Sequence, residues 1–369
     1  MSLSTLLPSR FAAVSVVACL TFPAIAQWSV VRLHPSGSIG PSAAYGGAGS
    51  QQVGSADLNG SSHALVWNGS ATDWQDLHPV GASQSTLYAT SGSLQVGTAD
   101  GHASLWSGTA GSWVDLHPQG QFSSSAAYDI SGVQQVGFAA VNSVRRAGLW
   151  SGSSDSWVDL TPNFVTGDAV AMGTTGSHQV GFVTVGSAAT GRRHASLWSG
   201  SSDTWVDLQA GVPGLYSSIA LAVSGNQQVG GGSVQGIYSA LLWQGSASSC
   251  VNLHRPEWGY SEALATNAAF QAGHATVPGL GLTASLWSGS AATWENLGAW
   301  LGEGFTSSTA TAVWQDPSTL YVGGLARNSA TGLNEAVLWR RPLPSPGAIS
   351  LLLAVPFTIH CRRRHPDKQ

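Results

Sequence analysis

The segment HASLWSGSSDTWVDL occupies residues 194–208, and near-copies of it recur along the chain. Residues 102–116 read HASLWSGTAGSWVDL, and residues 147–160 read AGLWSGSSDSWVDL. A Leu-Trp or Val-Trp pair marks seven such segments, at intervals of 39 to 52 residues. The chain therefore contains seven copies of one unit. The marking tryptophans are Trp67, Trp106, Trp150, Trp198, Trp243, Trp287 and Trp339.

Each unit holds four short segments with strand character, separated by Gly, Ser, Asn and Pro. Examples are AAYDISG at 126–132, QQVGFAA at 134–140, HASLW at 194–198 and WVDLHP at 113–118. Four antiparallel strands every 40–50 residues are typical of a β-propeller blade. A solenoid is the main alternative, but its units are usually shorter or helical and need distinct capping repeats. We predict an all-β fold, a seven-bladed β-propeller of four-stranded antiparallel blades.

The two ends of the repeat region predict how the ring closes. The last unit supplies strands at 310–316, 320–326 and 335–339 and then stops without a fourth. An unpartnered strand of the fourth type, WSVVRLHP, stands at 28–35. We expect Trp28–His34 to complete the last blade, because this pairing removes an exposed sheet edge.

Paired tryptophans with six residues between them, such as Trp198 and Trp205, recur in nearly every unit. Two interpretations are open: packing between neighbouring blades, and a row of sugar-stacking platforms. Recurrence favours packing, so we expect Trp205 to be a core residue. Cys250 takes the place of the second tryptophan in the fifth copy. Trp258 lies outside the pairs in a loop, where we expect it to be exposed.

The composition narrows the class of protein. Only 9% of the 369 residues are charged, against about 25% in typical soluble proteins, as is common in secreted β-proteins. Between residues 27 and 341 there are 9 Arg and no Lys against 17 Asp and Glu. A mildly acidic body cannot neutralise many phosphates, so no nucleic-acid partner is expected. Cys250 is the one cysteine of this body, so no intrachain disulfide framework is expected there.

The two ends of the chain carry targeting features. Arg10, an apolar segment at 11–22 and the small residues of Ala24-Ile25-Ala26 predict a signal peptide over residues 1–26. A lipid-attachment site at Cys19 is an alternative. The propeller would then span 27–341. Residues 342–369 form a Pro-rich linker, a short apolar segment and an Arg-rich tail, which predicts a sorting or anchoring signal or else a disordered tail.

Two families resemble parts of this chain. The combination of SGVQQVG (131–137), HASLW (194–198) and WVDL (205–208) resembles the extracellular HAF repeat family of bacteria. That resemblance implies a secreted, propeller-like protein and no known chemistry. The tail, with LPSPG at 343–347 and arginines at 362–364, is similar to the PEP-CTERM type of sorting signal. This similarity implies a membrane-bound sorting protease as a partner and a location in the bacterial cell envelope or extracellular matrix.

Aspartates and histidines recur at equivalent positions of the units and could belong to metal or catalytic sites. One carboxylate per blade, as at Asp76 and Asp115, cannot supply the six to eight oxygens of a calcium site. Single histidines at equivalent positions of different blades, such as His63 and His102, do not converge on a metal. We expect both sets to hydrogen-bond to neighbouring turns. No nucleophile elbow, metalloprotease or phosphate-loop motif is present, so we predict a non-enzymatic protein with no cofactor and no metal.

The topology indicates where a ligand would bind. In each blade, the connection between the second and third strands and the connection to the next blade emerge on one face of the ring, here called the shared face. Its connections vary in length and composition, and loops on a rigid scaffold often carry binding residues, although drifting solvated loops would look the same. The second-to-third loops contribute Arg145, Arg146, Arg192 and Arg193. The inter-blade loops contribute Arg255, Glu257, Trp258, Tyr260, Trp300 and Glu303.

Two interpretations of the four arginines are open. They form a positive patch for an anionic matrix polysaccharide, or nearby carboxylates such as Asp155 and Asp203 neutralise them. The sequence thus predicts a structural or binding module that binds extracellular polysaccharide or another surface protein. The alternative is a carbohydrate-active enzyme, a glycoside hydrolase or lyase. It would use Glu257, Glu262 and Glu303, and needs two carboxylates about 5–10 Å apart.

Overall fold

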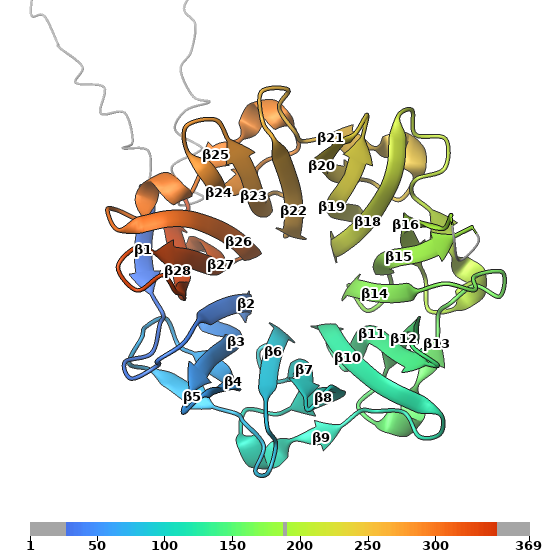
Figure 1. Ribbon diagram of the computed structural model, residues 1–369, viewed down its shortest axis with the longest axis horizontal. Coiled ribbons are helices and arrows are strands. Elements are labelled where there is room, and N and C mark those ends of the chain that lie inside the picture. Colours follow the sequence, from blue (N-terminus) through green and yellow to red (C-terminus); the bar gives the residue numbers. More distant parts are fainter. Residues whose placement is uncertain (1–26, 187–189, 345–369) are drawn as a thin grey trace, which may run out of the picture.

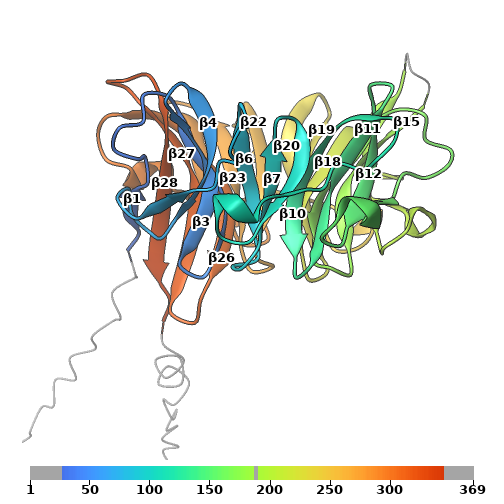
Figure 2. The ribbon, with the colours of Figure 1, turned by 90° about the horizontal axis from the view of Figure 1, so that it is seen from below.

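A computed structural model describes residues 27–186 and 190–344 of the chain. Seven four-stranded antiparallel sheets surround a central channel, so the prediction of a seven-bladed β-propeller is confirmed (Figure 1). Seen from the side, the strands run between the two flat faces of the ring (Figure 2). None of the helices within these residues is long and apolar enough to cross a membrane.

Each blade begins with its innermost strand and ends at the rim. Blade 1 contains β2 (Ser42–Ala48), β3 (Gln51–Leu58), β4 (Ser61–Trp67) and β5 (Trp74–Asp76). Blade 2 contains β6 (Ser85–Thr90), β7 (Gln95–Ala99), β8 (His102–Trp106) and β9 (Val114–Asp115). Blade 3 contains β10 (Phe122–Ser131), β11 (Gln134–Val141), β12 (Val144–Trp150) and β13 (Val158–Asp159). Blade 4 contains β14 (Ala169–Thr174), β15 (Gln179–Val185), β16 (Arg192–Trp198) and β17 (Val206–Asp207).

The remaining blades follow the same order. Blade 5 contains β18 (Leu215–Ser224), β19 (Gln227–Val234), β20 (Ile237–Trp243) and β21 (Val251–Asn252). Blade 6 contains β22 (Tyr260–Thr266), β23 (Gln271–Val277), β24 (Gly281–Trp287) and β25 (Glu295–Asn296). Blade 7 contains β26 (Phe305–Gln315), β27 (Thr319–Asn328), β28 (Asn334–Pro342) and β1 (Ser29–Arg32). Short 3-10 helices precede the fourth strand in blades 2 to 6: η1 (Ala110–Ser112), η2 (Ser154–Ser156), η3 (Ser202–Thr204), η4 (Ala247–Ser249) and η5 (Ala291–Thr293).

The N-terminal strand closes the ring as expected. β1 pairs antiparallel with β28, with Val30 opposite Trp339, and the Leu33 N–H donates to the Ala336 carbonyl at 2.8 Å. In Figure 1 the blue β1 lies beside the red β28, although the two strands come from opposite ends of the chain. β1 therefore covers the outer edge of β28 and completes blade 7.

The fourth strands are shorter than the sequence suggests. WVDLHP at 113–118 yields only the two-residue β9. The cause is the repeated aspartate, because Asp115 Oδ1 accepts the His117 N–H at 2.8 Å and turns the chain away from the sheet. The first strands differ in the other direction: β26 starts at Phe305, five residues before the expected start.

The two rows of tryptophans differ in burial. All seven third-strand tryptophans are 0% exposed, which confirms the packing interpretation for this row. The fourth-strand row lies nearer the rim, and Trp113 is 38% exposed. Trp205 is only partly buried, but it packs against the core cluster between blades 3 and 4, so the packing interpretation holds for this ring too. Its indole N–H donates to Ser196 Oγ at 2.9 Å, because this position before Leu-Trp carries a small hydroxyl residue.

A β-bulge interrupts every innermost strand at the same place, for example between Ala44 and Gly46. A bulge leaves one residue outside the pairing and redirects its side chain. These extra residues border the channel, narrowing it to a cavity of about 280 Å³. The bulged residues are Tyr45, Tyr88, Tyr128, Met172, Leu221, Leu264 and Thr311.

Candidate functional site

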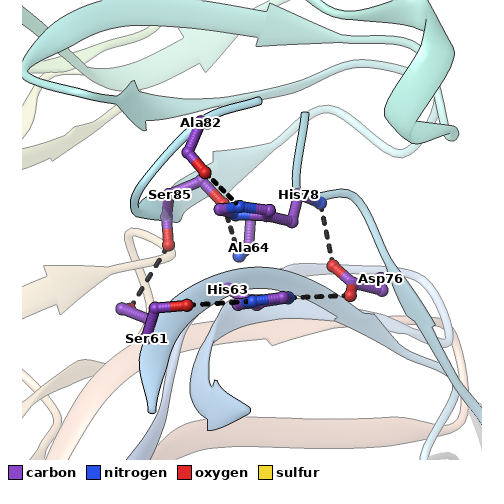
Figure 3. Close-up of polar contacts among 8 residues, drawn as sticks. Ser61, His63, Ala64, Asp76, His78, Ala82 and Ser85 are labelled. Carbon is purple, nitrogen blue, oxygen red and sulfur yellow. Dashed lines mark hydrogen bonds and ion pairs between the residues drawn. The ribbon is translucent and has the colours of Figure 1, made fainter. Parts of the chain in front are cut away.

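One hydrogen bond recurs at six of the seven junctions between blades. The Ala64 N–H leaves its own sheet and donates to Ser85 Oγ of the next blade at 2.9 Å (Figure 3). The same bond closes the ring, where the Ala336 N–H donates to Ser42 Oγ at 2.8 Å. After blade 3 the Ala147 N–H instead donates to Thr161 Oγ1, on the connection that leaves the same blade. The repeated hydroxyls of the shared face therefore hold the blades together.

The histidines that follow the fourth strands orient these hydroxyls. His78 Nε2 lies 2.9 Å from the Ala82 carbonyl, which can only accept, so Nε2 carries the proton (Figure 3). His78 Nδ1 then accepts from Ser85 Oγ at 2.8 Å. His117 repeats the arrangement with Ser125, and burial, then the neighbouring His102, lowers the pKa of His117.

The repeated aspartates bind the start of the third strand. Asp76 Oδ2 lies 2.8 Å from His63 Nδ1, and Asp76 Oδ1 accepts the His78 N–H (Figure 3). The rings of His63 and His78 stack with centroids 4.0 Å apart. The expected bond to a neighbouring turn is confirmed for Asp76, whereas His63 bonds to Asp76 of the neighbouring strand β5. Sequence reasoning missed the stacking, because it follows from the pairing of the third and fourth strands. Within the residues that the structure describes, no group of three or more His, Cys, Asp or Glu side chains could hold a metal ion.

The structure pairs two of the four predicted arginines with carboxylates. All four arginines lie at the start of third strands, β12 and β16, rather than in loops. The Arg145 guanidinium donates to Asp168 at 3.1 Å, and Arg146 pairs with Asp159. Burial alone would raise the pKa of Asp168, but the bonds and charge of Arg145 outweigh it and hold that pKa below its usual value.

The other two arginines lie against aromatic rings. Arg192 sits 3.5 Å from the centroid of Tyr216, and Arg193 sits 4.7 Å from that of Phe182. Such cation–π contacts fix the side chains on the protein itself. The neutralising carboxylates for the other pair are Asp168 and Asp159, not the Asp155 or Asp203 that the sequence suggests, because pairing follows strand register across the sheet and the junction.

The residues of the inter-blade loops do not form one site. Trp258 is only 4% exposed and packs against Trp287 and Trp294, so the expectation of an exposed loop ring was wrong. Arg255 donates to the Ala291 carbonyl at 2.9 Å and lies 5.2 Å from the centroid of Trp294.

The remaining predicted loop residues divide between packing and solvent. Trp300, in η6 (Gly298–Trp300), packs against the core between blades 6 and 7. Glu257 and Glu303 are exposed on two different inter-blade connections. No contact joins either glutamate to the other candidate carboxylate, Glu262, in the described part of the chain.

Glu262 belongs to a cluster that the sequence analysis did not find. Its two carboxylate oxygens accept the hydroxyls of Tyr238 and Tyr260, each at 3.0 Å. Burial raises the pKa of Glu262, although both hydrogen bonds oppose the change. Tyr260 stacks between Tyr238 and His274, and burial lowers the pKa of His274 to about 4. Both carboxylate oxygens are thus occupied by neighbouring side chains.

The shared face is hollow over blades 7, 1 and 2. A cavity of about 660 Å³, here called the blade-1 pocket, lies there. The β3–β4 hairpin and the β5–β6 connection both border it, which places it on the shared face. Its lining includes Tyr45, Ser55, Asp57, Ser62, Gln84 and Asn334.

Small residues in blade 1 create this pocket. On the second strand, Ser55 pairs with Ala64, and the equivalent residues that pair with Ala147 and Ala195 in blades 3 and 4 are Phe138 and Phe182. On the third strand, Ser62 stands two residues before its alanine, where blades 3, 4 and 5 carry Arg145, Arg193 and Tyr238. Long side chains thus line the shared face over blades 3 to 5, where a smaller cavity of about 400 Å³ lies beside Arg192 and Arg193, and hydroxyl groups leave the larger cavity open over blade 1. Aligning the copies of the repeat would have revealed this difference.

These features define the chain as a seven-bladed propeller with a polar pocket on one face. No family model matches it, and no curated protein matches it. Among solved structures it is similar to a puromycin hydrolase, with a TM-score of 0.53 and 10% identity over 81% of this chain and 54% of the other. It is also similar to an oligogalacturonate lyase from Vibrio parahaemolyticus, with a TM-score of 0.51 and 8% identity over 85% and 93% of the two chains. The chain spans about half the length of the puromycin hydrolase, and at these identities the similarity shows the fold alone.

Proposed function

We propose that this protein is a non-enzymatic binding module, secreted and retained in a bacterial cell envelope or extracellular matrix, with polysaccharide as its partner. The observation that carries the proposal is the blade-1 pocket, a cavity of about 660 Å³ on a rigid ring. Small-molecule sites commonly measure about 300–1,000 Å³. A membrane-bound sorting protease remains a proposed partner of the tail, most of which lies outside the described residues.

The arrangement of the carboxylates supports binding over glycoside hydrolysis. A glycosidase needs one carboxyl group free to donate a proton and a second to act as base or nucleophile. Here both oxygens of Glu262 are taken up by tyrosine hydroxyls, and Glu257 and Glu303 stand on separate connections.

The experiment is a glycan array probed with the purified body, residues 27–344. We expect retention of a subset of bacterial or plant polysaccharides and no release of shorter products after long incubation. Retention of no glycan on the array would refute a polysaccharide partner, and release of reducing ends or unsaturated ends would support the glycoside hydrolase or lyase alternative.

A second candidate function is ester hydrolysis, and one arrangement favours it. Ser61 Oγ lies 3.2 Å from His63 Nε2, and His63 Nδ1 lies 2.8 Å from Asp76 (Figure 3). A hydroxyl, an imidazole and a carboxylate in this order can activate a nucleophile. Ser61 Oγ would attack the acyl carbon while His63 takes its proton and passes it to the departing alcohol. Water would then release the acid from Ser61.

The repeat supplies a matched control for this candidate. His102 and Asp115 form the same pair in blade 2, but Asp100 stands where blade 1 has Ser61. A fluorophosphonate probe should label Ser61 in the parent and in His102→Gln but not in His63→Gln. Absence of label on Ser61 in the parent protein excludes this candidate.

A further inference from the structure

We infer that the blade-1 pocket binds an uncharged, hydroxyl-rich glycan. This inference rests on the proposed function and adds the place and the chemical class of the ligand. It differs from the anionic polymer that the arginines suggest in the sequence.

Unused polar groups converge on the pocket. Within the described residues, the side chains of Asp57, Gln84 and Asn334 have no hydrogen-bond partner, although all three line the cavity. They come from three blades: Asp57 from β3, Gln84 from the connection before β6, and Asn334 from β28. A carboxylate and two amides offer several acceptors and donors, which match the paired hydroxyls of a sugar ring. Ser55 and Ser62 add hydroxyls to the same wall.

One aromatic ring complements these polar groups. Tyr45 is the bulged residue of β2 and borders both the channel and the pocket. Its ring packs against that of Tyr88, with centroids 5.9 Å apart, so the phenol is supported on one side. A fixed ring next to polar groups suits a sugar, whose C–H face is apolar and whose edge carries hydroxyls.

Charge argues against an acidic ligand. Asp57 is the one carboxylate in the lining, and the lining holds no Arg, Lys or His. The predicted arginine cluster lies over blades 3 and 4, where its arginines contact Asp168, Asp159 and aromatic rings. A uronate or sulfate would therefore meet a negative charge and no positive one, which disfavours binding.

The repeat suggests a substitution that narrows the pocket with a side-chain arrangement already present in another blade. In blade 3, Tyr128 is the bulged residue and Phe138 occupies the position of Ser55, with the two rings 6.0 Å apart. Ser55→Phe reproduces this pair beside Tyr45. The variant is therefore expected to fold, and a melting temperature close to that of the parent checks it.

The experiment titrates neutral and acidic oligosaccharides into the purified body by calorimetry. The probes are neutral glucose, mannose and galactose tetrasaccharides and a galacturonate tetrasaccharide. We expect at least one neutral probe to bind and the galacturonate to bind at least tenfold more weakly. Ser55→Phe and Asp57→Asn should each weaken the best neutral probe at least tenfold. The control Val133→Ala, at an exposed position in the β10–β11 turn on the opposite face, should change its affinity less than twofold.

The outcomes separate the two levels of the proposal. If Ser55→Phe and Asp57→Asn bind the neutral probe as the parent does, the pocket is not the site, although the protein remains a glycan binder. If galacturonate binds more tightly than every neutral probe, the inferred ligand class is wrong. If no glycan binds here or on the array, the proposed function itself fails.

Discussion

Removal of residues 27–35 should prevent closure of the ring and destabilise the protein. This segment holds β1, which pairs with β28 from Ser29 to Arg32. It also holds Trp28, 5% exposed, and Leu33, 0% exposed. Without it, blade 7 loses its outer strand and β28 presents an unpaired edge.

The structure gives the size of the effect. Loss of a buried tryptophan costs about 3–5 kcal/mol and loss of a buried leucine about 2–5 kcal/mol. Trp28 has additional contacts, since its indole N–H donates to Glu295 and the Arg341 guanidinium lies 4.5 Å from the centroid of its ring. The deletion therefore removes on the order of 5–10 kcal/mol, which is comparable to the whole stability of a typical domain at about 5–15 kcal/mol.

Urea denaturation followed by tryptophan fluorescence measures the free energy of unfolding, and light scattering after gel filtration measures the oligomeric state. We expect the deleted protein to be unfolded or oligomeric. The single variant Trp28→Ala should remain folded but lose about 3–5 kcal/mol. Trp113→Ala is the matched control, because its ring is 38% exposed and its loss should cost only about 1–2 kcal/mol. A deleted protein that is monomeric and melts within two degrees of the parent would refute closure by β1.

Four further predictions follow from burial, charge and titration. Trp198→Ala should lower the free energy of unfolding by about 3–5 kcal/mol and Trp205→Ala by roughly half as much, because only the first ring is fully buried; equal losses would contradict this difference. Trp258→Ala should also lower the free energy of unfolding, measured by urea denaturation, by about 3 kcal/mol. A loss below about 1 kcal/mol would indicate that the Trp258 ring is exposed to solvent. Burial raises the pKa of Asp129 to about 6, so its protonated form favours the folded state. That contribution, up to about 3 kcal/mol, is present below pH 4 and is lost as the pH rises through 6. In Asp129→Asn the free energy of unfolding should therefore depend less on pH between 4 and 6. If its pH dependence equals that of the parent, Asp129 is not the group responsible. On immobilised acidic polysaccharide, the parent and the variant in which four arginines become serine should elute at the same low salt concentration. Earlier elution of the variant would support the arginine patch as a binding site for acidic polysaccharide. The changed residues are Arg145, Arg146, Arg192 and Arg193.

The sequence by itself determined the architecture, because each blade is specified by local pattern. The recurring Leu-Trp pairs marked the third strands, and the unpartnered strand at 28–35 identified the closing partner of the last blade. Even the function of the repeated carboxylates was predictable, since Asp76 bonds to residues of its own blade and the turn that follows.

Only the tertiary structure decided the site, because its residues meet across blade junctions. In the sequence Arg145 has no evident partner, whereas in the structure it forms an ion pair with Asp168, on the connection to the next blade. In the sequence Trp258 lies in a loop, whereas in the structure its ring packs against Trp287 and Trp294 of blade 6. The blade-1 pocket combines side chains from β3, the connection before β6, and β28, so no local pattern contains it. Local periodicity specifies strands, whereas cavities and charge pairs depend on which strands the closed ring brings together.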